Sequence, residues 1–171
     1  MELKELEEQT LKLFGVDNPE HLGEALLAAC NDVQKLDAFC ALIDNDLSVD
    51  YLQMIYQYYC ADRKDNKQDF TPKTVASFMG MLVGKSDHII DMCAGSGALI
   101  IQKWYHDKAL QFTAIEYDKS VIPYLIFNMV LRNIKCRILN ADALTDDEAL
   151  GEWDVSRGEK YGYLTTIKSA L

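Results

Sequence analysis

The sequence predicts an α/β fold in which a partial Rossmann-like sheet follows an all-helical N-terminal subdomain. Two observations carry this prediction. Apolar residues recur at helical spacing through the first third of the chain. Three short β-rich segments follow, and helical stretches separate them, which indicates parallel strands joined by helices.

The N-terminal third is expected to hold four helices, at residues 2–14, 19–30, 33–43 and 47–60. Gly15 is expected to end the first helix, and Asn18 to cap the second with Pro19 at its first position. The expected domains are a helical subdomain at 1–62, a polar linker at 63–69 and an α/β domain at 70–171.

Composition excludes several classes of protein. The chain of 171 residues is 49% hydrophobic and has no 18-residue apolar run, so we expect a cytoplasmic protein with no membrane partner. Residues 1–69 carry 15 acidic and 6 basic side chains (net −9) and residues 70–171 carry 12 and 11 (net −1), which sum to −10. A duplex-DNA binder is usually basic, so DNA is expected only through a partner subunit or domain. The five cysteines lack a C-x-x-C pair and are expected to be reduced core thiols rather than metal ligands.

A capped helix is predicted at the start of the α/β domain. Thr71 is expected to be its cap, with Pro72 at the first helical position and Gly84 after its end. The face expected to be buried consists of Val75, Phe78, Met79 and Leu82. The alternative is that the Thr71 hydroxyl and the N–H groups of the first turn serve a ligand.

A glycine-containing turn between a strand and a helix is the strongest local signal. The strand ends at Asp91, Gly95 and Gly97 form the turn, and Ile100 stands where a dinucleotide fingerprint needs a third glycine. No Lys-Ser or Lys-Thr follows, which excludes a P-loop. Such a turn suits a ligand with a carboxylate and an ammonium group, such as the methionine end of S-adenosylmethionine.

The strand–helix pattern then repeats twice. Strands are predicted at 112–118 and 136–142, with a helix at 121–133 between them, which implies a parallel doubly wound sheet. The three predicted strands end at or near acids, Asp91, Glu116 and Asp142, and ligands of such sheets bind at these ends. Glu116 lies 19 residues past Gly97, close to the spacing at which a carboxylate accepts ribose hydroxyls.

These motifs together resemble the N-6 adenine DNA methyltransferases, and most closely the modification subunits of type I restriction-modification systems. The resemblance rests on residues 68–76 (QDFTPKTVA), 91–97 (DMCAGSG) and 116–118 (EYD), in that order, and covers about residues 68–145. Those subunits carry a Phe-Tyr-Thr-Pro segment before an Asp-Pro-Ala-Cys-Gly-Ser-Gly turn.

The resemblance implies two groups of residues that bind S-adenosylmethionine. At the methionine end, Asp91 would hold the ammonium group, while other residues would border the methionine or shape the turn: Phe70, Thr71, Pro72, Cys93, Gly95, Ser96 and Gly97. At the nucleoside end, Glu116 would bind the ribose, Tyr117 would pack near the adenine, and Asp142, with Ala143 beside it, would accept a hydrogen bond from the adenine amino group.

The family's catalytic motif, Asn-Pro-Pro-Tyr or Asn-Pro-Pro-Phe at a strand end, is missing. The only prolines are Pro19, Pro72 and Pro123. Residues 152–155 resemble the strand that should deliver the motif, and Asp154, Tyr161 and Tyr163 are the nearby candidates. The catalytic residues are therefore unknown, and the sheet is expected to be incomplete.

We therefore expect a protein that binds S-adenosylmethionine or S-adenosylhomocysteine, the cofactor half of a DNA adenine methyltransferase. The alternative is a non-catalytic regulatory or structural subunit that retains the fold. A nicotinamide-dependent enzyme is disfavoured by the missing glycine. An open sheet edge after the third strand predicts a protein partner or a homo-oligomer.

Overall fold

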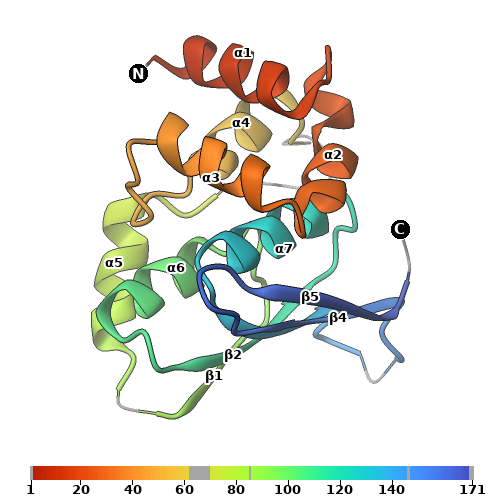
Figure 1. Ribbon diagram of the computed structural model, residues 1–171. Helices are drawn as coiled ribbons and strands as arrows, with labels where there is room; N and C mark the ends of the chain where they lie inside the picture. Colours follow the sequence, from red (N-terminus) through yellow and green to blue (C-terminus); the bar gives the residue numbers. More distant parts are fainter. Residues whose placement is uncertain (1, 62–69, 85, 146, 170–171) are drawn as a thin grey trace.

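The computed structural model describes residues 2–61, 70–84, 86–145 and 147–169. The predicted linker at 63–69 and the first two residues of the 68–76 motif lie outside the described residues. Helices lie above a single sheet in Figure 1, with the N-terminal helices farthest from it. The helices are α1 (Leu3–Phe14), α2 (Leu22–Ala29), α3 (Val33–Leu42), α4 (Tyr51–Tyr59), α5 (Lys73–Leu82), α6 (Ala98–His106) and α7 (Ile122–Leu131). The strands are β1 (His88–Asp91), β2 (Gln111–Glu116), β3 (Lys135–Asn140), β4 (Gly151–Ser156) and β5 (Tyr163–Lys168).

The four predicted N-terminal helices are present, and local signals set their ends. Gly15 ends α1 in the left-handed conformation, at φ 76°. The Asn18 side chain caps a short 3-10 helix, Pro19–His21, that leads into α2. Asp32 and Asp50 cap α3 and α4, because their carboxylates accept backbone N–H groups of the first turn.

Helix α7 is the centre of the hydrophobic core. All ten of its residues are buried, because it lies between the sheet and the N-terminal helices (Figure 1). Phe127 of α7 packs edge-on against Phe14 of α1 and Phe39 of α3, with ring centroids 5.4 and 5.5 Å apart. The N-terminal helices thus share one core with the α/β part.

The sheet confirms the three predicted strands, places the strand-like residues 152–155 in β4 and adds β5. Its order is β1-β2-β3-β4-β5, with β1, β2 and β3 parallel and β4 and β5 antiparallel. Strand β4 pairs with β3, so the edge expected to be open after the third strand is occupied. In the described part of the chain, the open edges are β1 and β5.

The expectation of a doubly wound sheet is wrong in one respect. Among the described residues, helices cover only one face of the sheet (Figure 1). Side chains on that face are buried, as in Phe112, Ala114, Ile138 and Trp153, whereas the alternate positions are at least partly exposed. Helices α6 and α7 lie on the same side because successive right-handed crossovers that proceed in one direction stay on one face.

Helix α5 differs from its prediction at both its start and its buried face. Pro72, not Thr71, occupies the cap position, and no side chain caps the helix. The helix packs on α6, and its buried residues are Ala76 and Gly80. Their small side chains allow a close approach: a Cβ added to Gly80 would lie 3.4 Å from the Lys103 backbone. The face predicted to be buried is exposed instead, with Phe78 56% exposed.

The cysteines are free thiols, and three of them, Cys30, Cys40 and Cys136, are buried as expected. Cys93 is exposed on the turn after β1, so it is not a core thiol. Within the described residues, no helix is long and apolar enough to cross a membrane.

Candidate functional site

The turn between β1 and α6 needs glycine at two positions. Gly95 and Gly97 have φ values of 54° and 98°, which side-chain-bearing residues rarely adopt. A Cβ on Gly97 would lie 2.7 Å from Cε of Met129, so the turn sits close against α7. The first N–H groups of α6 have no carbonyl partner within the helix, as at the start of any α-helix.

Glu116 connects the end of β2 to this turn. Its Oε2 accepts a hydrogen bond from the Gly95 N–H at 2.8 Å, and its Oε1 accepts one from the Asp118 N–H at 2.8 Å. Burial raises the pKa of Glu116, and these backbone donors oppose that shift. Nδ2 of the buried Asn140 donates to the carbonyls of Glu116 and Tyr117, which holds this strand end in place.

Asp91 ends β1 with one carboxylate oxygen unsatisfied. Its Oδ1 accepts a hydrogen bond from the Cys93 N–H at 3.3 Å. Its Oδ2 is buried and has no hydrogen-bond partner among the described residues. Burial raises the pKa of this carboxyl, and the Cys93 N–H opposes the shift. An unpaired buried carboxylate oxygen is costly, so this site suits a ligand that donates hydrogen bonds or carries positive charge.

Phe70 lies against the turn. A Cβ on Gly95 would be 3.3 Å from Cε1 of the Phe70 ring. The same ring packs edge-on against Tyr56, with centroids 5.7 Å apart, and the Tyr56 hydroxyl lies 3.2 Å from Oδ2 of Asp118. Phe70, Gly95 and Glu116 therefore form one continuous wall.

The remaining predicted residues are placed around this wall, and the Tyr117 backbone N–H bonds to the Glu116 carboxylate. The Thr71 carbonyl accepts a hydrogen bond from Gln53 of α4, and Pro72 is exposed at the start of α5. Tyr117 is 72% exposed, a position open to a stacking ligand. Asp142 follows β3 and accepts the Leu144 N–H at 2.9 Å, and Ala143 beside it is half-buried.

The three catalytic candidates lie away from the turn. Strand β4 is antiparallel to β3, so its carboxyl end lies beside the amino end of β3. Asp91 and Glu116 lie instead at the carboxyl ends of the parallel strands. The Tyr161 hydroxyl donates to Oδ1 of Asp37 at 2.6 Å, which ties this turn to α3. Asp154 and Tyr163 belong to the same hairpin, so the structure does not bring these side chains to the site.

The sequence model of the N-6 DNA Methylase family matches residues 44–157, which is two thirds of the chain. The chain belongs to the N-6 DNA methylase family. The match extends beyond residues 68–145 in both directions and includes α4 and the Asp50 cap. No curated protein and no solved structure matches this chain.

Sequence reasoning missed a buried polar network behind the glycine turn. Ser96, 1% exposed, donates from Oγ to Oδ2 of Asp50 at 2.7 Å, so its hydroxyl points inward rather than toward a ligand. Asn128 of α7 donates to Oδ1 of Asp50 and to the Ser96 carbonyl, both at 2.9 Å. Arg132 donates to Oδ1 of Asn128 at 2.7 Å. In the sequence, Asp50 stands just before a predicted helix, which indicates a helix cap. It does not indicate the contact with Ser96, 46 residues away.

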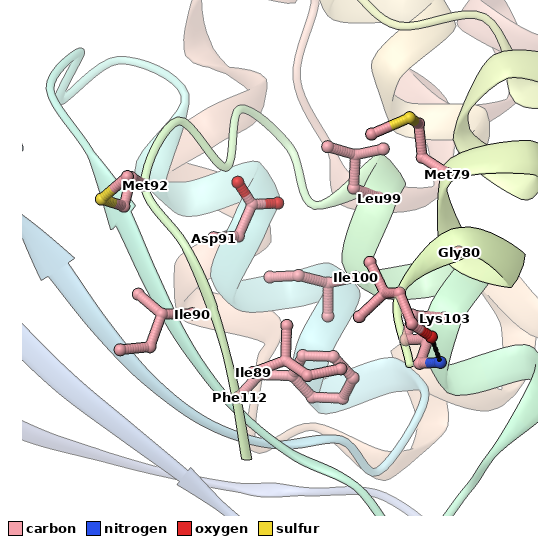
Figure 2. A pocket seen from close by; sticks show the side chains of 11 residues that line it. Met79, Gly80, Ile89, Ile90, Asp91, Met92, Leu99, Ile100, Lys103 and Phe112 are labelled. Atoms are coloured by element: carbon pink, nitrogen blue, oxygen red, sulfur yellow. Dashed lines mark hydrogen bonds between the residues drawn. The ribbon is translucent and has the colours of Figure 1, made fainter. Parts of the chain in front are cut away.

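An apolar groove borders the site along the open edge of β1. Figure 2 shows Ile89, Ile100 and Phe112 grouped in it, while Ile90 and Met92 point to the other side of the strand. Its volume is about 160 Å³, and its lining also includes two charged residues, Asp91 and Lys103. The other lining residues are Met79, Gly80, Val83, Ile90, Met92 and Leu99. Among the described residues, β1 beside this groove pairs only with β2, so its other edge is open.

Proposed function

We propose that this methylase binds S-adenosylmethionine at the turn between β1 and α6. The observation that carries the proposal is the buried, unpaired Oδ2 of Asp91 beside the glycine turn. The ammonium of the methionine moiety would donate to this oxygen, and the first N–H groups of α6 would face the carboxylate. The methionine end of S-adenosylmethionine fits these residues, because its ammonium group would pair with the buried carboxylate oxygen of Asp91.

The nucleoside would lie along the strand ends. Glu116 would accept the ribose hydroxyls on lone pairs that the Gly95 and Asp118 N–H groups leave unused. The exposed Tyr117 ring would pack near the adenine, and Asp142 would accept from its amino group. Phe70 would close the methionine end.

Methyl transfer to DNA would need an element that this sequence does not supply. In the family that the sequence resembles, an Asn-Pro-Pro-aromatic motif accepts the target amino group and stacks on the flipped base. This chain has three separate prolines, and the strand that resembled the motif's carrier runs antiparallel beside β3. The chain would thus hold the cofactor, while a partner chain or domain completes the reaction and contacts DNA.

The open edge of β1 supports the proposal of a polypeptide partner. Ile90 on β1 and Met92 just after it are each 60% exposed. Helix α5 separately exposes five apolar side chains: Val75, Phe78, Met79, Met81 and Leu82. An unpaired strand edge beside exposed apolar side chains favours association.

The test is calorimetric titration with S-adenosylmethionine and S-adenosylhomocysteine. Wild type should bind both, because both carry the ammonium group. The Asp91→Asn variant should bind both roughly 10- to 100-fold more weakly, the cost of a charge-assisted hydrogen bond. Asp87→Asn, an exposed acid just before the same strand, is the matched control and should bind as wild type. If wild type binds neither ligand, the protein is instead a structural or regulatory subunit that retains the fold.

A further inference from the structure

The segment just before α4 is hydrogen-bonded to α6, which follows the glycine turn, and to α7, which packs against that turn. Nε2 of Gln102, on α6, donates to the Ser48 carbonyl at 2.6 Å. Arg132, on α7, donates from Nε to the Leu47 carbonyl at 2.9 Å and from an Nη to the Val49 carbonyl at 2.8 Å. Residues 47–50 are thus attached to the α/β part along its core.

Asp50 is the charged member of this segment and is only 8% exposed. Its carboxylate accepts three hydrogen bonds: from the Gln53 N–H, from Nδ2 of Asn128 and from Oγ of Ser96. Arg132 supplies the compensating positive charge: burial lowers the pKa of Arg132 to about 10, and the Asp50 charge opposes that shift. A buried carboxylate with this number of donors is held in a single orientation.

Two of these three bonds bear on Ser96, which lies between the two left-handed glycines. Asp50 accepts the Ser96 hydroxyl directly, and Asn128 links the Asp50 carboxylate to the Ser96 carbonyl. The hydroxyl and the carbonyl of Ser96 are therefore both held by hydrogen bonds to residues packed behind the turn. A turn with two positive φ values has little intrinsic preference for one shape, so external bonds must select it.

We propose that Asp50 is a positioning residue of the ligand site, which holds the glycine turn in its binding shape through Ser96 and Asn128. It touches no ligand. The N-terminal helical part thereby contributes to a site whose ligand-contacting residues all come from residues 70–143. The effect on affinity rests on the proposed S-adenosylmethionine binding, whereas the effect on the turn itself does not.

The experiment compares two capping residues of the same type. Asp50→Ser keeps a side chain that caps α4 but is too short to reach Ser96 and Asn128. Asp32→Ser makes the same change at the cap of α3, where Asp32 accepts the N–H groups of Gln34 and Lys35. Ser96→Ala removes the contact from the other side and leaves the α4 cap intact. Amide hydrogen exchange at residues 94–98 is measured without ligand, and the Kd for S-adenosylmethionine is measured by calorimetry.

The expected result is exchange at Gly95 and Gly97 that is about tenfold faster in Asp50→Ser and Ser96→Ala, while exchange in α3 stays unchanged. The Kd should rise by a similar factor. Asp32→Ser should change neither quantity. If Asp50→Ser does not fold, Ser96→Ala alone decides the question through the same readout.

Unchanged exchange at Gly95 and Gly97 in a folded Asp50→Ser or Ser96→Ala variant would overturn the inference. Faster exchange throughout the protein would also overturn it, since that result shows a general loss of stability. If wild type does not bind S-adenosylmethionine, the proposed function fails, and faster local exchange would still support the positioning of the turn by Asp50.

Discussion

The carboxylate of Glu116, at the end of β2, accepts the Gly95 N–H at 2.8 Å across the glycine turn that follows β1. Two residues 21 positions apart in the chain are therefore joined at the centre of the proposed ligand site. The bond fixes the carboxylate and one wall of the turn at the same time. A ligand that uses Glu116 would bind to an acceptor that is already oriented.

Replacement of Glu116 should separate these two roles. Glu116→Ala is expected to weaken S-adenosylmethionine binding by about 1–3 kcal/mol, because it removes a charged acceptor and releases the Gly95 N–H. Glu116→Gln keeps one oxygen acceptor and should lose less affinity. Calorimetry with Glu24→Ala, an exposed acid on α2, provides the control. Equal affinities for Glu116→Ala and wild type would remove Glu116 from the site.

The affinity for S-adenosylmethionine should fall as the pH is lowered. Burial raises the pKa values of Asp91 and Glu116, so both protonate at a higher pH than ordinary carboxyls. A cationic ligand binds the ionised forms, and the Kd should therefore rise on going from about pH 8 to about pH 5. Titrations across this range should show a flatter dependence for Asp91→Asn. A Kd of wild type that does not change with pH would contradict the prediction.

The same shifts have the opposite effect on the unliganded protein. A carboxyl with a raised folded-state pKa contributes stability that is fully present below its unfolded pKa and is lost as the pH rises through the folded pKa. Asp91 and Glu116 therefore favour the folded state at mildly acidic pH. The ligand should stabilise the protein most at neutral pH, where both carboxylates are ionised.

The loss of unfolding free energy on replacing each of three glycines with alanine should depend on backbone strain and on contact of the added Cβ. Gly97→Ala combines a φ of 98° with a Cβ 2.7 Å from Met129 and should lower the free energy of unfolding by about 1–3 kcal/mol. Gly15→Ala, at φ 76° with open space around it, should cost only the strain, about 1 kcal/mol. Gly84→Ala meets neither problem and should be neutral within about 0.5 kcal/mol. Urea unfolding measures all three, and equal values for Gly97→Ala and Gly84→Ala would contradict the strained turn.

The exposed face of α5 should drive association. Wild type is expected to sediment as more than a monomer over a concentration series, and Phe78→Glu with Met81→Glu should shift it toward the monomer. Both positions are exposed, so the unfolding free energy should change by no more than about 0.5 kcal/mol for each. Val33→Glu, which is also exposed but lies on α3, is the control. A monodisperse wild-type monomer would count against a binding surface at this edge.

Sequence patterns predicted those parts of the fold that local signals determine. Caps and periodicity located the helices before residue 60, and the βαβ pattern located β1, β2 and β3. Residues 152–155 were identified as strand-like and lie in β4, but its antiparallel pairing with β3 and the existence of β5 were missed, because both depend on long-range register. Helix α5 was misjudged because its contact with α6 uses Ala76 and Gly80, whose small size allows close approach but adds little to an apolar pattern.

The site was predictable where residues are adjacent in the chain or at strand ends. Glu116 contacts the turn through the Gly95 N–H, and Asp91 stands at the end of β1 just before it. That these residues bind a ligand stays a prediction. Asn140, which braces Glu116 and Tyr117, could be located at a strand end but not assigned that role. The roles of Asp50 and Asn128 could not be predicted from the sequence, since only the folded chain brings α4 and α7 behind the turn.

The buried guanidinium of Arg132 determines where this protein can be divided. Two of its hydrogen bonds end on the carbonyls of Leu47 and Val49, and among the charged groups Asp50 does most to favour its protonated form. A fragment expressed from residue 70 onward would keep the cation in the interior and discard those acceptors, a penalty of several kcal/mol by general experience with unpaired buried charges. The smallest autonomous folding unit should therefore begin before residue 47, well ahead of the segment in which the family motifs start.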